Sequence, residues 1–380
     1  MSELASYSLQ AVFLALVAVV VMSRSKKTDL YQFALISIWL IGVIAIYARY
    51  KEGQVFFYSN DQLFHQQAIE YYIPVDGIHL SAVIGLRYLL TVPAYLISLL
   101  GFNAMLVIKF FQLCALLLIF RKAKTLAKQY GFKIIYLQIP LFAGPLPLFM
   151  SLLGLRDVIL AYLTLISIFP RSLELRILSI IATGLLRPHL AVALIFGLVV
   201  EVLLRRIHTR FQVLLVALTL ILSYFFGAIG FTVGDFVTTG GNFIFPATIF
   251  SIDNISRLAL NIVGLQFLVL DGTAAGVVAS STMLLLVSRL VFVETFLAPS
   301  IFFVFFFQQK SILKKESLQV SMAMFFFLGL VFQNVIFTNS TRQNLPFITT
   351  MGLIGIIQLS DYRSKRRIGI HKKTISPKNQ

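Results

Sequence analysis

Three arginines interrupt the apolar stretches of this sequence where a helix is expected to begin or end. Arg156 stands in SLLGLRDVILAY, Arg187 in LLRPH and Arg342 in NSTRQN. A guanidinium group is planar and donates hydrogen bonds in pairs, which suits a phosphate or pyrophosphate group. We therefore predict that the three arginines bind phosphate. The alternatives are that they reach lipid headgroups or that they pair with Asp157 and Asp61.

Three polar residues accompany these arginines. His189 follows Pro188 at a predicted helix start, where it is a candidate phosphate ligand or proton donor, or a plain boundary histidine. Asp157 begins a helix, where it is expected to cap the helix and complement its dipole. Asn344 lies in the same polar turn as Arg342. We predict supporting roles for Asp157 and Asn344.

The polar segment FFYSNDQLFHQQAIEYYIPVDG contains the best candidate for acid–base chemistry. Asp61 and His65 are four residues apart, so on a helix they face the same side. A carboxylate there can act as general base toward a sugar hydroxyl, with His65 assisting. The alternatives are that Asp61 holds Mg²⁺ or Mn²⁺ or only caps a helix. The helix is expected to be amphipathic and to lie on the membrane surface, with an apolar face of Leu63, Phe64, Ile69 and Tyr72.

The composition indicates which elements position these residues. Of the 380 residues, 58% are hydrophobic and only 12% are charged, whereas a soluble domain carries about 25% charged residues. Apolar runs of nearly the length needed to cross a bilayer recur along the chain, and runs such as LQAVFLALVAVVVM do not alternate as barrel strands do. We predict an all-α, polytopic transmembrane bundle of about 11–13 helices.

Basic clusters orient the chain and account for its net charge of +17 without a nucleic-acid partner. They lie at 24–27, 121–128, 171–176, 205–210, 310–316 and 362–373. Placing all of them in the cytoplasm puts the N-terminus outside, the C-terminus inside, and loops 50–79 and 230–255 outside. Residues 1–361 then form one transmembrane domain, and 362–380 form a basic cytoplasmic tail.

This layout predicts helices throughout the chain. They span 7–23, 30–48, 102–120, 132–151, 157–170, 174–187, 188–204, 211–229, 318–338 and 343–359. Segment 80–98 is expected to be interfacial or re-entrant, and region 256–309 to cross once or three times. Most isolated charges then gather at the outer face. The exceptions are Lys109, Arg289 and Glu294, which lie inside apolar stretches.

The layout and several short motifs resemble the GT-C superfamily of membrane glycosyltransferases and the related O-antigen- and exopolysaccharide-polymerase-like proteins. The resemblance covers roughly residues 30–205 and rests on LLGFN, FRKAKTLAKQYGF, GLRD and LLRPH. It implies a sugar donor linked to polyprenyl phosphate or pyrophosphate, used at the outer face of the bacterial inner membrane. It also implies a catalytic Asp61, with arginines that hold the phosphate. The acidic pair typical of GT-C enzymes is replaced here by NDQ, which argues against metal dependence.

The resemblance implies further partners, and two other function classes stay open. The acceptor is expected to be a glycan or a lipid, with membrane lipids and envelope-polysaccharide assembly proteins as partners. A transporter or flippase for a lipid-linked oligosaccharide or small anion would place charges through the midplane of the bilayer, as Lys109, Arg289 and Glu294 suggest. A membrane scaffold is the third class. No Walker loop, HExxH or CxxC motif occurs in the sequence.

Overall fold

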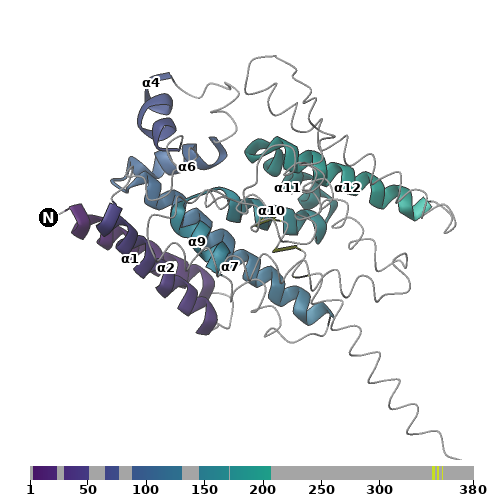
Figure 1. Ribbon diagram of the computed structural model, residues 1–380, viewed down its shortest axis with the longest axis horizontal. Helices are drawn as coiled ribbons and strands as arrows, with labels where there is room; N and C mark the ends of the chain where they lie inside the picture. Colours follow the sequence, from purple (N-terminus) through teal and green to yellow (C-terminus); the bar gives the residue numbers. More distant parts are fainter. Residues whose placement is uncertain are drawn as a thin grey trace, which may run out of the picture.

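The computed structural model describes residues 3–23, 30–50, 65–76, 88–130, 145–170, 172–206 and, near the C-terminus, 345, 346, 349, 350 and 353. Within these ranges all the regular elements are helices (Figure 1), which confirms the all-α prediction for this part of the chain. Several predictions lie outside the described residues: the outer loop 230–255, the helices 211–229 and 318–338, region 256–309 and the tail 362–380. So do the site residues Asp61, Arg342 and Asn344.

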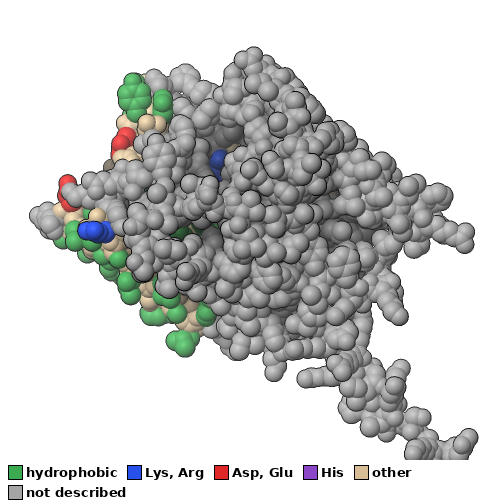
Figure 2. All heavy atoms as spheres, viewed as in Figure 1, with side chains coloured by type: hydrophobic (Ala, Val, Ile, Leu, Met, Phe, Trp, Pro, Cys, Tyr) green, Lys and Arg blue, Asp and Glu red, His purple; other side chains and the backbone are tan. Residues whose placement is uncertain are grey.

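Three helices are long and apolar enough to cross a membrane. They are α1 (Glu3–Ser23), α2 (Leu30–Tyr50) and α7 (Ala104–Tyr130). At a rise of about 1.5 Å per residue, roughly 20 residues match the hydrocarbon thickness. Hydrophobic side chains cover the exposed edge of α1 and α2 (Figure 2); they include Leu9, Phe13, Leu16, Val20, Phe33, Ile38 and Ile41. An apolar surface of this kind is typical of helices that face lipid, so the chain is a membrane protein.

Five further helices can be compared with their predicted bounds, and two of them differ. Helices α10 (Asp157–Ile168), α11 (Leu173–Leu186) and α12 (Pro188–Arg206) begin and end close to their predicted bounds. Helix α7 continues well past the predicted end at residue 120, because RKAKTLAKQY consists largely of strong helix formers. Only α9 (Pro145–Leu153) is described within the predicted helix 132–151.

Two short helical segments belong to the region between α2 and α7. The described part of the predicted segment 80–98 forms helix α6 (Tyr88–Ser98), and the interfacial or re-entrant character of the segment stays a prediction. The described part of the polar loop, from His65 on, is helical; it passes through the π-helical turn η1 (Ala68–Tyr72) and continues as α4 (Ile73–Asp76). It packs against α6. A helix in this loop is therefore confirmed, and its start near residue 61 stays a prediction.

Side-chain hydrogen bonds set the relative directions of the helices. The backbone N–H of Ile159 on α10 donates to Gln112 Oε1 on α7 at 3.2 Å. Further along both helices, Lys122 Nζ donates to the carbonyl of Phe169. The two contacts are separated by the same number of residues on each helix, so α10 runs parallel to α7. Ser167 on α10 meets Ser179 on α11 at 2.8 Å, within the tight α10–α11 hairpin.

The start of α1 lies beside the start of α7. Gln10 Nε2 donates to the carbonyl of Gly101 at 3.2 Å, and Gln10 Oε1 accepts from the Asn103 backbone N–H at 2.7 Å. One end of the bundle therefore collects the first residues of α1, α7, α10 and α12 and the last residues of α11. We call this end the charged end, because the buried charged side chains described below lie there. That it faces the outside stays a prediction.

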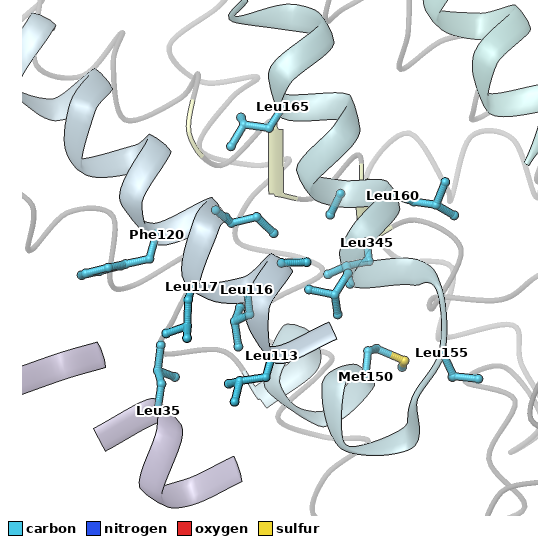
Figure 3. Packing of buried hydrophobic residues seen from close by; sticks show 14 of the residues in the cluster. Leu35, Leu113, Leu116, Leu117, Phe120, Met150, Leu155, Leu160, Leu165 and Leu345 are labelled. Carbon is cyan, nitrogen blue, oxygen red and sulfur yellow. The ribbon is translucent and has the colours of Figure 1, made fainter. Parts of the chain in front are cut away.

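The core forms around one face of α7. Leu113, Leu116, Leu117 and Phe120 recur at helical spacing and are buried against Leu35, Met150, Leu160 and Leu165 (Figure 3). Leu345 lies among the same side chains. The five described residues from 345 to 353 are helical and buried, and their spacing places them on one helix face. A C-terminal stretch within the predicted helix 343–359 thus packs into the same core as α7 and α10.

A glycine turn connects α9 to α10. Gly154 has a φ of 69°, and a Cβ added to it would lie 3.1 Å from Lys109 Cγ. We expect Gly154→Ala to lower the free energy of unfolding by about 1–2 kcal/mol for the left-handed backbone, with an added loss for the crowded lysine stem. Gly101→Ala is the matched control, since Gly101 has a φ of 88° and nothing within 4 Å of its Cβ position. Equal losses of melting temperature in detergent would contradict a tight contact between Gly154 and Lys109.

Candidate functional site

A buried ion pair joins the start of α10 to the turn between α11 and α12. Arg187 Nη2 lies 3.4 Å from Asp157 Oδ1, and the two side chains are 3% and 0% exposed. Arg187 ends α11 with extended dihedrals, which the following Pro188 favours, and α12 begins at that proline. The pairing of an arginine with Asp157 is therefore confirmed. Direct contact of Arg187 with lipid headgroups is wrong, because the side chain is buried.

Arg156 also connects the start of α10 to the end of α11. It is half-buried, and its guanidinium group donates through Nη1 to the carbonyl of Leu186 at the C-terminal end of α11. Carbonyls at a helix C-terminus lack intrahelical donors and carry partial negative charge, so a cation is favourable there. Arg156 also occupies the N-cap position of α10 with no side-chain cap. The prediction that Asp157 caps this helix is wrong, because Asp157 is its first residue and its carboxylate turns to Arg187.

Lys109 is a further buried cation at the charged end. It is 2% exposed, and its Nζ donates to the hydroxyl of Tyr7 on α1 at 3.4 Å. Tyr7 in turn stacks on Tyr47 of α2, with ring centroids 3.7 Å apart. Lys109 lies in the second turn of α7, roughly 7 Å along the axis from the helix start, and its stem lies against Gly154. Lys109 therefore lies in the first turns of α7, at the charged end of the bundle.

The sequence related Lys109 only to the transport alternative. The signal that could have placed it is the lysine itself, because a charged residue inside an apolar helix is rare and is usually functional. Gln112 was missed altogether. It is fully buried, and its Oε1 accepts from the backbone N–H of Ile159, one of the groups at the start of α10 that have no intrahelical partner. An amide in an apolar run carries no comparable signal, so only the packing of α7 on α10 identifies it.

His65 is fully buried in the helical segment that leads into η1. One turn later Ile69 packs with Met105 and Ile108 in the first turns of α7, next to Lys109. Ile69 was predicted to lie on the membrane surface, but it packs against α7 within the protein, and Tyr72 is half-buried. The pairing of His65 with Asp61 stays a prediction.

Three cationic side chains lie at the charged end, each with its own contact. Arg187 pairs with Asp157, Arg156 donates to the Leu186 carbonyl and Lys109 donates to Tyr7. Guanidinium and ammonium groups are the usual protein ligands of phosphate oxygens. The charged end therefore has side chains of the kind that bind an anionic group.

No family model, curated protein or solved structure matches this chain. The site therefore stands on its own geometry. Of the predicted site residues, the structure brings Arg156, Asp157 and Arg187 together, and it places the backbone of His189 in the first turn of α12 beside them.

Asp61, Arg342 and Asn344 lie outside the described residues, and only a neighbour of Asn344 is described. Leu345, which directly follows Asn344 in the sequence, is buried in the core that also contains Leu160 of α10. Among the residues that the structure describes, no three His, Cys, Asp or Glu side chains lie close enough to hold a metal ion. Mg²⁺ or Mn²⁺ at Asp61 stays an open alternative, since Asp61 lies outside them.

Proposed function

We propose that this chain is an integral membrane glycosyltransferase or polysaccharide polymerase. It takes a sugar linked to polyprenyl phosphate or pyrophosphate and acts at the extracytoplasmic face of a bacterial inner membrane. The observation that supports this most strongly is the buried Asp157–Arg187 pair with Arg156 and Lys109 at one end of an apolar helical bundle. Fixed cations in a site of low dielectric constant stabilise a phosphate leaving group as its charge develops.

The proposed reaction is a displacement at the anomeric carbon of the donor sugar. The acceptor oxygen bonds to that carbon while the bond from the carbon to the phosphate oxygen breaks, and the electron pair leaves with the phosphate. Arg156 and Arg187 hold the departing anion. Asp61 takes the proton of the acceptor hydroxyl, with His65 and His189 assisting. Arg342 and Asn344 are proposed to complete the phosphate site; they directly precede Leu345, which is buried in the core.

The lipid part of the donor needs an apolar surface beside the phosphate site. Helix α6 and the turn after it expose Leu89, Leu96, Leu99 and Leu100. This surface adjoins the start of α7, against which α6 packs. The polyprenyl chain is proposed to lie along it while the phosphate reaches the cations.

The test is incubation of the purified protein with polyprenyl-linked sugars, followed by measurement of sugar transfer or chain growth. Asp61→Asn should lower the rate about 100-fold or more, as loss of a general base does. Glu70→Gln is the matched control, because Glu70 is an exposed carboxylate on the helix of the same loop. It should keep the rate of the unchanged protein. Absence of transfer from every polyprenyl-linked donor would rule out the proposed activity.

Transport of a lipid-linked oligosaccharide or small anion is the second candidate function. It is favoured by Lys109, a buried cation on a helix long enough to span the membrane. A transporter would carry labelled substrate across the membrane of sealed vesicles and leave the sugar–phosphate bond intact. Flux without bond cleavage would therefore replace the glycosyltransferase proposal with this one.

A further inference from the structure

Helix α7 continues past the span expected for the hydrocarbon into a basic segment. The sequence RKAKTLAKQY follows Phe120 without a break in the helix. At a rise of about 1.5 Å per residue, Arg121 lies roughly 26 Å and Lys128 roughly 36 Å from the start of α7 at Ala104, on either side of a hydrocarbon thickness of about 30 Å. A helix that begins at one surface of the bilayer therefore reaches the headgroups of the other surface in this basic segment.

Contacts with two other helices place the basic segment at the end of the bundle opposite the charged end. Phe120 stacks on Tyr31 in the first turn of α2, with ring centroids 5.3 Å apart. Lys122 Nζ donates to the carbonyl of Phe169, the residue that follows α10. On the inward side of the segment, Leu126 is buried in the same core as Phe120. The basic segment is therefore held in place by packing against the rest of the bundle.

The outward side of the basic segment is cationic. Arg121 and Lys128 are exposed and seven residues apart, so they share one face of α7, about 10 Å apart along the helix axis. Lys124 lies between them on that face and is half-buried, with its Nζ 5.1 Å from the centroid of the Phe120 ring. Helix α7 contains no Asp or Glu, so no carboxylate of its own lies beside these cations. Their apolar stems can lie along hydrocarbon while the charged groups reach the headgroups.

We propose that Arg121, Lys124 and Lys128 bind the headgroups of anionic phospholipids in the leaflet opposite the charged end. Each basic residue close to an anionic bilayer surface adds to the attraction, which falls off within a Debye length. Cations carried by a packed helix are already arranged for binding, so less ordering is needed when the lipid arrives. The competing interpretation is that these side chains are only solvated and that the protein does not distinguish anionic from zwitterionic lipids.

The test measures the apparent dissociation constant of a short-chain phosphatidylglycerol for the purified full-length protein in neutral detergent. The constant follows from the rise in melting temperature as the lipid is added. The double variant Arg121→Gln with Lys128→Gln should bind at least about tenfold more weakly, since two charges that attract the headgroup are lost. Both positions are exposed and glutamine is a good helix former, so the variant should fold. If it does not fold, Lys128→Gln alone decides the proposal, with at least about threefold weaker binding expected.

The matched control is Arg121→Lys with Lys128→Arg, which keeps both charges at the same positions of α7. It should change the affinity for phosphatidylglycerol less than about twofold, because the attraction depends on charge. An equal loss in this control and in the glutamine double variant would contradict an electrostatic headgroup surface. So would equal stabilisation of the unchanged protein by short-chain phosphatidylcholine and by phosphatidylglycerol.

Arg187→Lys distinguishes this surface from the charged end, where the proposed function places a different phosphate group. We expect Arg187→Lys to leave phosphatidylglycerol binding as it is in the unchanged protein. Binding that Arg187→Lys weakens and that the glutamine double variant leaves unchanged would place the lipid at the charged end and overturn the proposal. Absence of sugar transfer would overturn the proposed function and leave this lipid surface in place, since the two rest on opposite ends of the bundle.

Discussion

Arg187→Lys will lower the rate of sugar transfer by at least about 100-fold, the effect expected when one fixed donor to a developing anion is removed. Lysine keeps the charge that neutralises Asp157, so the buried pair and membrane insertion should survive. Lysine lacks the planar fork that holds two phosphate oxygens at once. The measurement is the rate of transfer from a polyprenyl-linked sugar, with the amount of protein in the membrane fraction determined in parallel.

The matched control for this prediction is Arg121→Lys. Arg121 is exposed on α7, far along the helix from Lys109 and the charged end. This substitution should leave the rate unchanged. Arg187→Ala, which removes the charge as well, should abolish transfer while the protein still inserts. Normal transfer by either Arg187 variant would refute its role in holding phosphate.

Asp157→Ala will have the largest effect on stability. It removes the carboxylate that pairs with Arg187 in a buried setting, where loss of one partner costs about 3–5 kcal/mol because the remaining charge stays desolvated. The measurement is unfolding by heat or denaturant in detergent, compared with the unchanged protein. The expected result is a loss of several kcal/mol in the free energy of unfolding.

The double variant Asp157→Leu with Arg187→Met is the matched comparison. Replacing both members of a buried pair by apolar residues of similar volume is often neutral or stabilising. The double variant should therefore be more stable than Asp157→Ala alone, and a double-mutant cycle measures the coupling. Losses that simply add would show that the two charges do not interact in the folded protein. Transfer activity should stay absent in the double variant, because the fork of Arg187 is missing.

Local sequence signals were sufficient for the helices of the described part. Apolar runs and polar interruptions predicted α10, α11 and α12 to within a few residues, because each interruption is also a helix boundary: RD at the start of α10, PRS before α11 and RP at the start of α12. The same signals set the end of α7 too early. A basic cluster marks where a chain leaves the hydrocarbon, but it does not end a helix, since lysine and arginine are good helix formers.

The candidate site was predicted only in part. Arg156, Asp157 and Arg187 were identified because charges in apolar surroundings are conspicuous, and the alternating layout placed them at one end of the bundle. Their partners were not identified. Arg187 pairs with Asp157, and Arg156 donates to a backbone carbonyl. Both contacts depend on distances of a few ångströms between packed helices. Sequence spacing gives no such distances.

Sequence alone determined that this is a helical membrane protein with its isolated charges at helix ends, because hydrophobicity and backbone satisfaction in lipid act on each segment separately. The tertiary structure decided that Lys109 is buried beside Tyr7 and Gly154, and that Gln112 accepts from the start of α10 through the parallel packing of α7 on α10. It also decided that Leu345 enters the same core. Such contacts join residues far apart in the chain, and they follow from how side chains fill the space between helices, which no local pattern encodes.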